Sequence, residues 1–240
     1  MESVTGIESI WNKTCKIERK SALNGDIKTD VAVIGGGMAG ILTAYQLERS
    51  GVHTVVLEAE QIGGGQTKNT TAKITCQHGL FCRTFIEKKG KEAARLYVQA
   101  NQDAVEEYKR IICQEQIDCD LRVSDAYVYS RDKEKLEQET EAAGELGINA
   151  SFEKQIEIPV ECAGAVRFRD QAEFHPLKFI EALAKKLTVY EETPAKEVEG
   201  NWIITPCGKV MAGKIVFATH FPFINFPGLY FARMHQERSY

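Results

Sequence analysis

The sequence predicts an α/β fold, and three features lead to that prediction. The apolar run "VAVI" at residues 31–34 is typical of a strand buried on both faces of a parallel sheet. A glycine cluster follows it and opens into a helical pattern over 38–49, with Gly51 as its expected end. The run "HTVVLEA" at 53–59 then reads as a second strand. Strand, helix and strand form a βαβ unit of about thirty residues.

The composition is that of a globular protein with a buried core, because 43% of the 240 residues are hydrophobic and 27% charged. The net charge of −4, without long basic blocks, predicts no nucleic-acid partner. No apolar run has the length of a membrane span and the N-terminus lacks an apolar signal core, so no membrane and a cytoplasmic location are expected. The seven cysteines form no Cys-x-x-Cys pair, which predicts reduced thiols and no metal site.

The rest of the chain alternates between helical and extended patterns. Residues 61–79 are rich in Gly and Thr and predict a long loop with at most one helical turn. The later expected elements are a helix over 91–116, a strand over 121–130, an exposed amphipathic helix over 132–147 and a helix over 174–187. Four short segments between 188 and 220 predict a β-meander, and within them "KIVFAT" at 214–219 predicts a second buried strand of the first sheet.

The glycine cluster has the spacing G-x-G-x-x-G at Gly35, Gly37 and Gly40. In a nucleotide-binding turn the first glycine permits the tight turn, the second lets a pyrophosphate approach the backbone, and the third lets helix and strand pack closely. The helix N-terminus then offers free N–H groups to the phosphates. Glu58 ends the second strand roughly 20 residues further on, where a carboxylate accepts ribose hydroxyl protons and disfavours a 2′-phosphate. The pattern predicts a dinucleotide site but does not separate NAD from FAD.

The following segments favour FAD. A dehydrogenase that uses NAD usually continues with another βα repeat, whereas this chain continues with "GGGQTKNTTAKIT" and returns to the sheet late, at "FATH". That order resembles the FAD-dependent oxidoreductases of the D-amino-acid-oxidase/glycine-oxidase (DAO) superfamily, in the branch with γ-glutamylputrescine-oxidase-like and Rieske-fused proteins. The residues that carry the resemblance lie in 30–75, 174–187 and 214–240 and cover about half of the chain. The resemblance implies a Rossmann-like FAD/NAD(P)-binding domain with a β-meander and an incomplete, interleaved α+β substrate domain.

The resemblance also implies roles for individual residues. The turn from Gly35 through Gly37, Met38 and Ala39 to Gly40 would hold the FAD pyrophosphate, and Glu58 with Ala59 would hold the adenosine ribose. Gln66 and Thr67 would touch the pyrophosphate or the ribityl chain, and Val198 would contact the adenine through its backbone. Thr70, Thr71, Ala72 and Lys73 would pass beside the isoalloxazine, and Ala218 and Thr219 would lie under the cofactor. No catalytic residue is assigned. The implied reaction is oxidation of a C–N bond of an amine or amino acid by hydride transfer to flavin N5.

Several of these residues have a plain structural alternative. Lys73 could stabilise the reduced flavin or be a solvated loop lysine, and Thr70 and Thr71 could bond the flavin or the loop backbone. For His220 a structural hydrogen bond at the strand end is favoured over a place facing the active site. His175 is expected to begin a helix and His53 to be exposed. A contact with a substrate carboxylate is also considered for Arg233, His235 and Arg238, but it is not the favoured interpretation.

The expected domains follow the interleaved order. They are a lead-in over 1–29, an FAD-binding domain over 30–118 and 165–222, and a substrate domain over 119–164 that begins to return at 223–240. Relatives in the family are longer, so the chain is expected to be a fragment or truncated product that lacks a C-terminal domain or partner chain. The rival readings are a truncated FAD-binding module without activity of its own, an NAD-dependent dehydrogenase, and a structural fragment that pairs with another chain.

Overall fold

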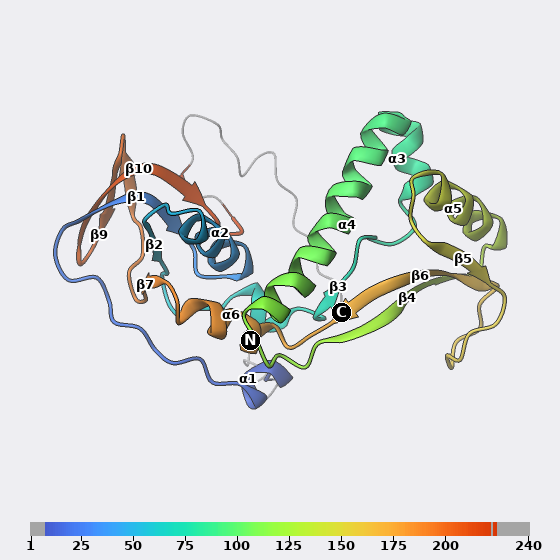
Figure 1. The fold of residues 1–240 in the computed structure, drawn as a ribbon, viewed down its shortest axis with the longest axis horizontal. Helices are drawn as coiled ribbons and strands as arrows, with labels where there is room; N and C mark the ends of the chain where they lie inside the picture. Colours follow the sequence, from blue (N-terminus) through green and yellow to red (C-terminus); the bar gives the residue numbers. More distant parts are fainter. Residues whose placement is uncertain (1–7, 222, 225–240) are drawn as a thin grey trace, which may run out of the picture. The chain divides into compact units, whose positions relative to one another are not determined.

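The computed structural model describes residues 8–221, 223 and 224, and the chain forms two compact units (Figure 1). The first unit combines Met1–Thr70 with Pro176–Tyr240, and the second is Thr71–His175. Each unit has its own sheet, so each is described by itself. The tail residues weighed as substrate contacts, Arg233, His235 and Arg238, lie outside the described residues.

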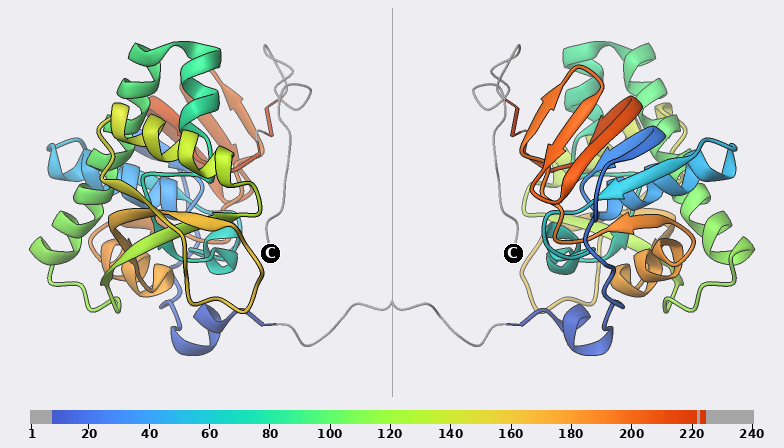
Figure 2. Two further views of the ribbon diagram at one scale, coloured as in Figure 1. Left: turned by 90° about the vertical axis from the view of Figure 1, so that its right-hand side faces the viewer. Right: turned by 90° about the vertical axis from the view of Figure 1, so that its left-hand side faces the viewer.

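The first unit is built on a six-stranded mixed sheet. Its strands are β1 (Ile27–Ile34), β2 (Thr54–Leu57), β7 (Thr188–Tyr190), β8 (Glu197–Glu199), β9 (Trp202–Thr205) and β10 (Gly208–Phe217). Their order across the sheet is β7-β2-β1-β10-β9-β8, and the right-hand view of Figure 2 shows β1 in blue between β2 and β10. β1 is parallel to both neighbours, as expected for a strand that is buried over its last four residues. One face of these strands packs into a core cluster that includes Ala32, Ile34, Val55 and Leu57.

Helix α2 (Met38–Arg49) confirms the helix predicted between the first two strands. Its end is fixed by Gly51, whose φ of +78° is a conformation that L side chains rarely adopt. The Gly51 N–H donates to the Glu48 carbonyl at 2.9 Å and the Val52 N–H donates to the Leu47 carbonyl at 3.0 Å. This pair of bonds is a Schellman motif, which satisfies the last carbonyls of the helix and turns the chain into β2.

The predicted meander is correct for β8, β9 and β10 but wrong for the segment "TVYEE". Residues 188–190 form β7, which pairs in parallel with β2 at the edge of the sheet. The reason is that helix α6 (Pro176–Ala184) precedes β7, and a helical connection returns the chain in the parallel direction. "KIVFAT" pairs with β1 as predicted, but it is not buried, because Phe217 is 47% exposed where the strand reaches the cavity described below.

The second unit contains a four-stranded antiparallel sheet and three helices. The strands are β3 (Lys73–Ile74), β4 (Arg122–Ser130), β5 (Ala150–Glu153) and β6 (Gly164–Glu173), and the helices are α3 (Cys82–Lys89), α4 (Lys91–Gln114) and α5 (Lys133–Glu145). β6 pairs with β4 on one side and with both β3 and β5 on the other. The predicted loop at 61–79 therefore contains a short strand, β3, besides the predicted turn of helix η1 (Gln66–Asn69).

The two units divide the chain at positions other than the expected boundaries at 118/119 and 164/165. Residues 71–118 lie in the second unit because α4 packs against α3, and α3 packs against α5. Residues 165–173 belong there because β6 is the strand to which the other three strands of that sheet are bonded. The sequence pattern did not predict α3, β5 or β6, and these are the elements that join the second unit together.

Helix α5 is also more buried than the expected exposed helix. Leu136 is fully buried, and the carboxylate of Glu139 is buried beside the start of α3. It accepts the N–H groups of Cys82 at 2.7 Å and Arg83 at 3.1 Å, so it caps α3 from another helix. Burial and the nearby Glu139 carboxylate raise the pKa of the Cys82 thiol. This thiol is therefore a packing group.

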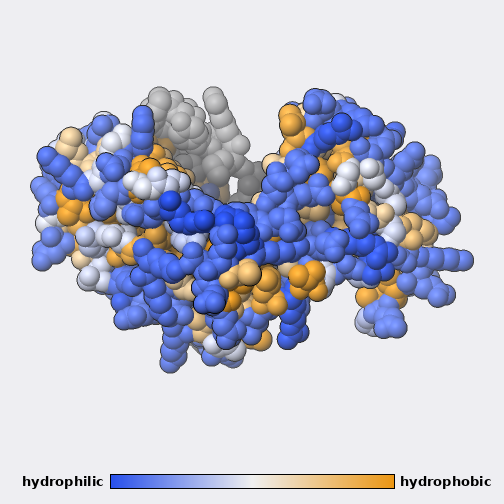
Figure 3. All heavy atoms as spheres, viewed as in Figure 1, coloured by the Kyte–Doolittle hydropathy of each residue, from blue (hydrophilic) through white to orange (hydrophobic). Residues whose placement is uncertain are grey.

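None of the helices that the structure describes is long and apolar enough to cross a membrane. On the face shown in Figure 3, hydrophilic residues predominate over the described surface. All seven cysteines are free thiols. Over the same described residues, no group of three or more His, Cys, Asp or Glu side chains is arranged to hold a metal ion.

Candidate functional site

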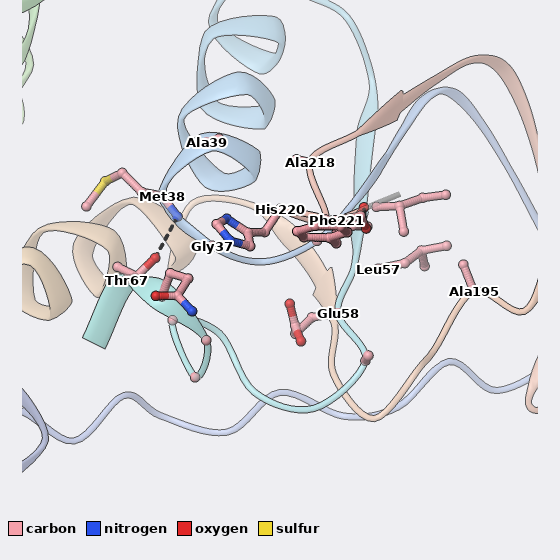
Figure 4. Close-up of a pocket in the computed structure, with 18 of the residues that line it drawn as sticks. Gly37, Met38, Ala39, Leu57, Glu58, Thr67, Ala195, Ala218, His220 and Phe221 are labelled. Carbon is pink, nitrogen blue, oxygen red and sulfur yellow. Dashed lines mark hydrogen bonds between the residues drawn. The ribbon is translucent and has the colours of Figure 1, made fainter. Parts of the chain in front are cut away.

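A cavity of about 550 Å³ lies in the first unit at the carboxyl ends of β1, β2 and β10 (Figure 4). The residues that follow these strands, Gly35, Glu58 and Ala218, all line it. Open sheets with parallel strands bind ligands at this end, because the loops that leave the carboxyl ends of the strands meet there. The volume is in the range of pockets that hold cofactors and drug-sized molecules.

The glycine turn, Gly35–Gly40, forms one wall of the cavity. Gly35 has a φ of +113°, and a Cβ built on it would lie 2.5 Å from the Ala218 carbonyl oxygen. A Cβ on Gly40 would lie 1.8 Å from the Gly35 carbonyl oxygen. Both positions therefore exclude every side chain for reasons of backbone packing, which agrees with the predicted roles of the first and third glycines.

Gly37 also lines the cavity, but it differs from Gly35 and Gly40 because no backbone atom lies where its Cβ would be. A Cβ at this position would meet only the Thr67 hydroxyl, at 3.4 Å. Gly37 is also the N-cap of α2 and has no side chain to cap the helix. The backbone at the start of α2 is thus accessible from the cavity, and a helix N-terminus carries a partial positive charge that attracts anions.

Glu58 is held in a fixed orientation by the backbone. Its Oε2 accepts the Gly36 N–H at 2.6 Å, and its Oε1 accepts the Glu60 N–H at 2.9 Å. The side chain is half-buried and lines the cavity. A carboxylate has about four lone-pair sites, so this one can accept further hydrogen bonds from the hydroxyl groups of a bound sugar.

The loop wall, Gly63–Thr67, forms a second side of the cavity next to the glycine turn. The Gly63 N–H donates to the Gly36 carbonyl at 3.0 Å, and the Met38 N–H donates to the Thr67 hydroxyl at 3.0 Å, the dashed line in Figure 4. Thr67 is buried. The loop wall is therefore bonded directly to the glycine turn at two points.

An N-terminal strap, residues 9–23, is linked by hydrogen bonds to the residues on either side of the loop wall. The fully buried carboxylate of Glu191 accepts the Ile62 N–H at 2.7 Å and the Lys20 N–H at 2.9 Å, and it pairs with Arg19 at 3.1 Å. Trp11 donates from its indole nitrogen to the Thr70 carbonyl at 2.9 Å. The predicted lead-in is thus an ordered part of the first unit that positions the loop wall.

The structure places the sequence-predicted residues in three groups. Those that line the cavity are Gly35, Gly37, Met38, Ala39, Glu58, Ala59, Gln66, Thr67, Ala218 and Thr219. Gly40 lies behind the turn, Val198 packs against the core cluster of the sheet, and the Thr70 carbonyl is bonded to Trp11. Thr71, Ala72 and Lys73 belong to the second unit, and their place beside a cofactor stays a prediction.

Sequence reasoning missed part of the cavity wall. Pro194 and Ala195 line it because the chain after β7 is bonded to the end of β2, where the Thr193 N–H donates to the Glu58 carbonyl at 2.8 Å. No local sequence signal predicts that pairing between the chain after β7 and the end of β2. His220 also lines the cavity, and the structural hydrogen bond expected for its side chain is absent from the part of the chain that the structure describes. His53 and His175 agree with expectation, because His53 is exposed and His175 directly precedes α6.

Comparisons with known proteins point to one family. The family model described as "FAD dependent oxidoreductase" (DAO) matches residues 30–237. The putative Rieske 2Fe-2S iron-sulfur protein YhfW of Bacillus subtilis is 38% identical over 97% of this chain and 48% of its own length. The gamma-glutamylputrescine oxidoreductase of Escherichia coli is 27% identical over 82% of this chain and 50% of its length. The chain thus spans about half the length of these relatives.

A solved structure supports the fold. The L-proline dehydrogenase of P. horikoshii superimposes with a TM-score of 0.67 over 82% of this chain and 54% of that protein. The sequence identity is 21%, so the likeness concerns the arrangement of strands and helices alone.

Proposed function

The chain belongs to the DAO family of FAD dependent oxidoreductases, and we propose that its first unit holds FAD for the oxidation of a C–N bond in an amine or amino acid. The observation that carries this proposal is the cavity in which the glycine turn and Glu58 face each other at the carboxyl ends of the parallel strands. It offers a helix N-terminus for an anion and an oriented carboxylate for a sugar within one cavity.

The residues present fit this cofactor. Gly37 without a Cβ, together with Met38 and Ala39, would receive the diphosphate, and Glu58 with Ala59 would receive the adenosine ribose. Gln66 and Thr67 in the loop wall would contact the diphosphate or the ribityl chain, while Ala218 and Thr219 would lie under the cofactor. We also propose that the backbone of Val198 contacts the adenine.

The chemistry proposed is that of the family's cofactor. FAD, held by the residues named above, would supply a two-electron acceptor, so the carbon that bears the amine would give up its hydride to flavin N5, and water would hydrolyse the imine product. The protein's own contribution is to bind and orient the substrate. We propose that the second unit, Thr71–His175, supplies the substrate domain, and that Thr70, Thr71, Ala72 and Lys73 run beside the flavin ring. The gamma-glutamylputrescine oxidoreductase relative supports an amine or amino-acid substrate.

A second candidate is a cofactor-binding module without activity of its own. It is favoured by the observation that the chain spans 48% of the length of the YhfW relative. We propose that a C-terminal domain or a partner chain supplies the remainder, and the Rieske name of that relative makes an iron–sulfur domain the first candidate. The free state of all seven cysteines supports a reducing, cytoplasmic location.

The visible absorption spectrum of the purified 240-residue chain after incubation with FAD and gel filtration tests the proposal. We expect bound-flavin bands that persist through the column, and anaerobic bleaching on addition of a substrate amine if the chain is active. Bound flavin that no amine or amino acid bleaches would favour the module. A colourless chain that takes up no FAD would contradict both candidates.

A matched pair of glycine variants makes the result specific to the cavity. Gly37→Ala adds a Cβ at ordinary contact distance from Thr67, so folding is preserved while approach to the backbone is narrowed. Gly144→Ala adds a Cβ with no atom within 4 Å, in helix α5 of the second unit. We expect FAD retention to fall in the first variant and to stay unchanged in the second.

A further inference from the structure

We propose that His220 is a ligand of the cofactor diphosphate and donates a hydrogen bond from its imidazole to a phosphate oxygen. The proposal deepens the proposed function and rests on it, because it takes the cavity to hold FAD. His220 follows the end of β10 and lines the cavity. In the view of Figure 4 its imidazole extends toward the start of α2, where the diphosphate is proposed to lie, and Gly37 lines the same cavity.

The backbone of His220 is held in an uncommon conformation. Its φ is +62°, and the Phe221 N–H donates to the Thr219 carbonyl at 2.6 Å, which closes a three-residue γ-turn around His220. The Thr219 hydroxyl braces the same turn by donating to the Phe221 carbonyl at 2.8 Å. A γ-turn with positive φ at its centre is rare and strained for a residue other than glycine.

Glycine would adopt this turn without strain. The chain has a histidine here, at a backbone conformation that favours glycine. In the described part of the chain the imidazole makes no hydrogen bond that would offset the strain. Strained positions of this kind cluster where a side chain meets a ligand. Because His220 lines the cavity, a ligand bound there would supply the missing partner.

The charge balance of the cavity points the same way. Among the described residues that line it there is no lysine or arginine, and Glu58 brings a negative charge. The diphosphate of FAD carries two further negative charges. His220 is the one lining side chain of the described set that can become a cation, and a hydrogen bond from a cation to a phosphate is among the stronger ones in proteins.

The experiment measures dissociation constants of the 240-residue chain for FAD, ADP and adenosine by titration calorimetry, with the melting temperature of each variant. ADP carries the diphosphate and adenosine lacks it. His220→Gly removes the imidazole and relieves the turn, so we expect ADP and FAD to bind about tenfold or more weakly, adenosine to bind within about twofold of the wild type, and the melting temperature to hold or rise. A purely structural role for His220 would not separate ADP from adenosine.

Two further variants keep the outcomes distinct. His220→Asn tolerates positive φ and keeps a neutral donor, so its loss of ADP affinity should be smaller than that of His220→Gly. His53→Ala removes an exposed histidine outside the cavity and should leave the dissociation constants for FAD, ADP and adenosine unchanged. Equal ADP affinity in the wild type and both His220 variants would overturn the proposal and leave the proposed function standing. A wild-type chain that binds neither FAD nor ADP would overturn the proposed function, and this inference with it.

Discussion

The two walls of the cavity are built in different ways. The glycine turn is held by backbone packing between neighbouring elements, and a Cβ on Gly40 would lie 1.8 Å from the Gly35 carbonyl oxygen. The loop wall is held by hydrogen bonds to distant parts of the chain, above all through Glu191, which binds Ile62, the residue before the loop wall, together with Lys20 of the N-terminal strap. The first wall therefore depends on the absence of side chains, and the second depends on one buried carboxylate.

The largest expected effect comes from breaking the glycine turn. Gly40→Ala forces a Cβ into the Gly35 carbonyl, and backbone atoms on both sides cannot move aside as a flexible side chain would. We expect a loss of about 4 kcal/mol or more in the free energy of unfolding, measured by urea denaturation.

Gly144→Ala is the control for Gly40→Ala. Its Cβ meets nothing within 4 Å and it lies inside helix α5, so it should stabilise the protein by about 0.5–1 kcal/mol. If Gly40→Ala unfolds at the same urea concentration as the wild type, backbone packing does not hold this wall.

The second largest effect is expected from a change that destabilises the loop wall. Glu191→Ala leaves the buried Ile62 N–H and the partly buried Lys20 N–H without their acceptor, and the loss of a buried acceptor costs about 1–3 kcal/mol. We expect a total of about 2–4 kcal/mol and increased hydrogen exchange at residues 61–69, measured by mass spectrometry.

Glu192→Gln supplies the matched control for that change. Glu192 also pairs with Arg19, but its side chain is 68% exposed, so its loss should cost about 1 kcal/mol or less. Equal exchange at residues 61–69 in Glu191→Ala and Glu192→Gln would show that the strap does not position the loop wall.

The smallest expected effect concerns the bond that joins the walls. Thr67→Val keeps the shape of the side chain but removes the hydroxyl that accepts the Met38 N–H. We expect a loss of about 1 kcal/mol in stability together with weaker FAD binding. Thr43→Val, at a half-buried position of α2 outside the cavity lining, is the comparison. A variant at Thr67 that matches Thr43→Val in both measurements would argue that the two walls act independently.

The same contrast explains what the sequence could predict. The strand β1, the bounds of α2, the glycines and Glu58 were predicted because each signal lies within a few residues of the feature it announces. β7, Pro194, Ala195 and His220 were misjudged or missed, since strands paired across more than a hundred residues bring them to the site. The unit boundaries differed because α3 and β6, which had no local signal, tie residues 71–118 and 165–173 to the second unit.

Hydrogen exchange of the 240-residue chain with and without FAD tests the central claim most directly. If the cavity at the carboxyl ends of β1, β2 and β10 holds the cofactor, FAD should slow exchange at residues 35–41 and 61–69 and leave α5 unchanged. Binding of FAD with unchanged exchange at residues 35–41 would contradict the account, because the cofactor would then lie away from the glycine turn.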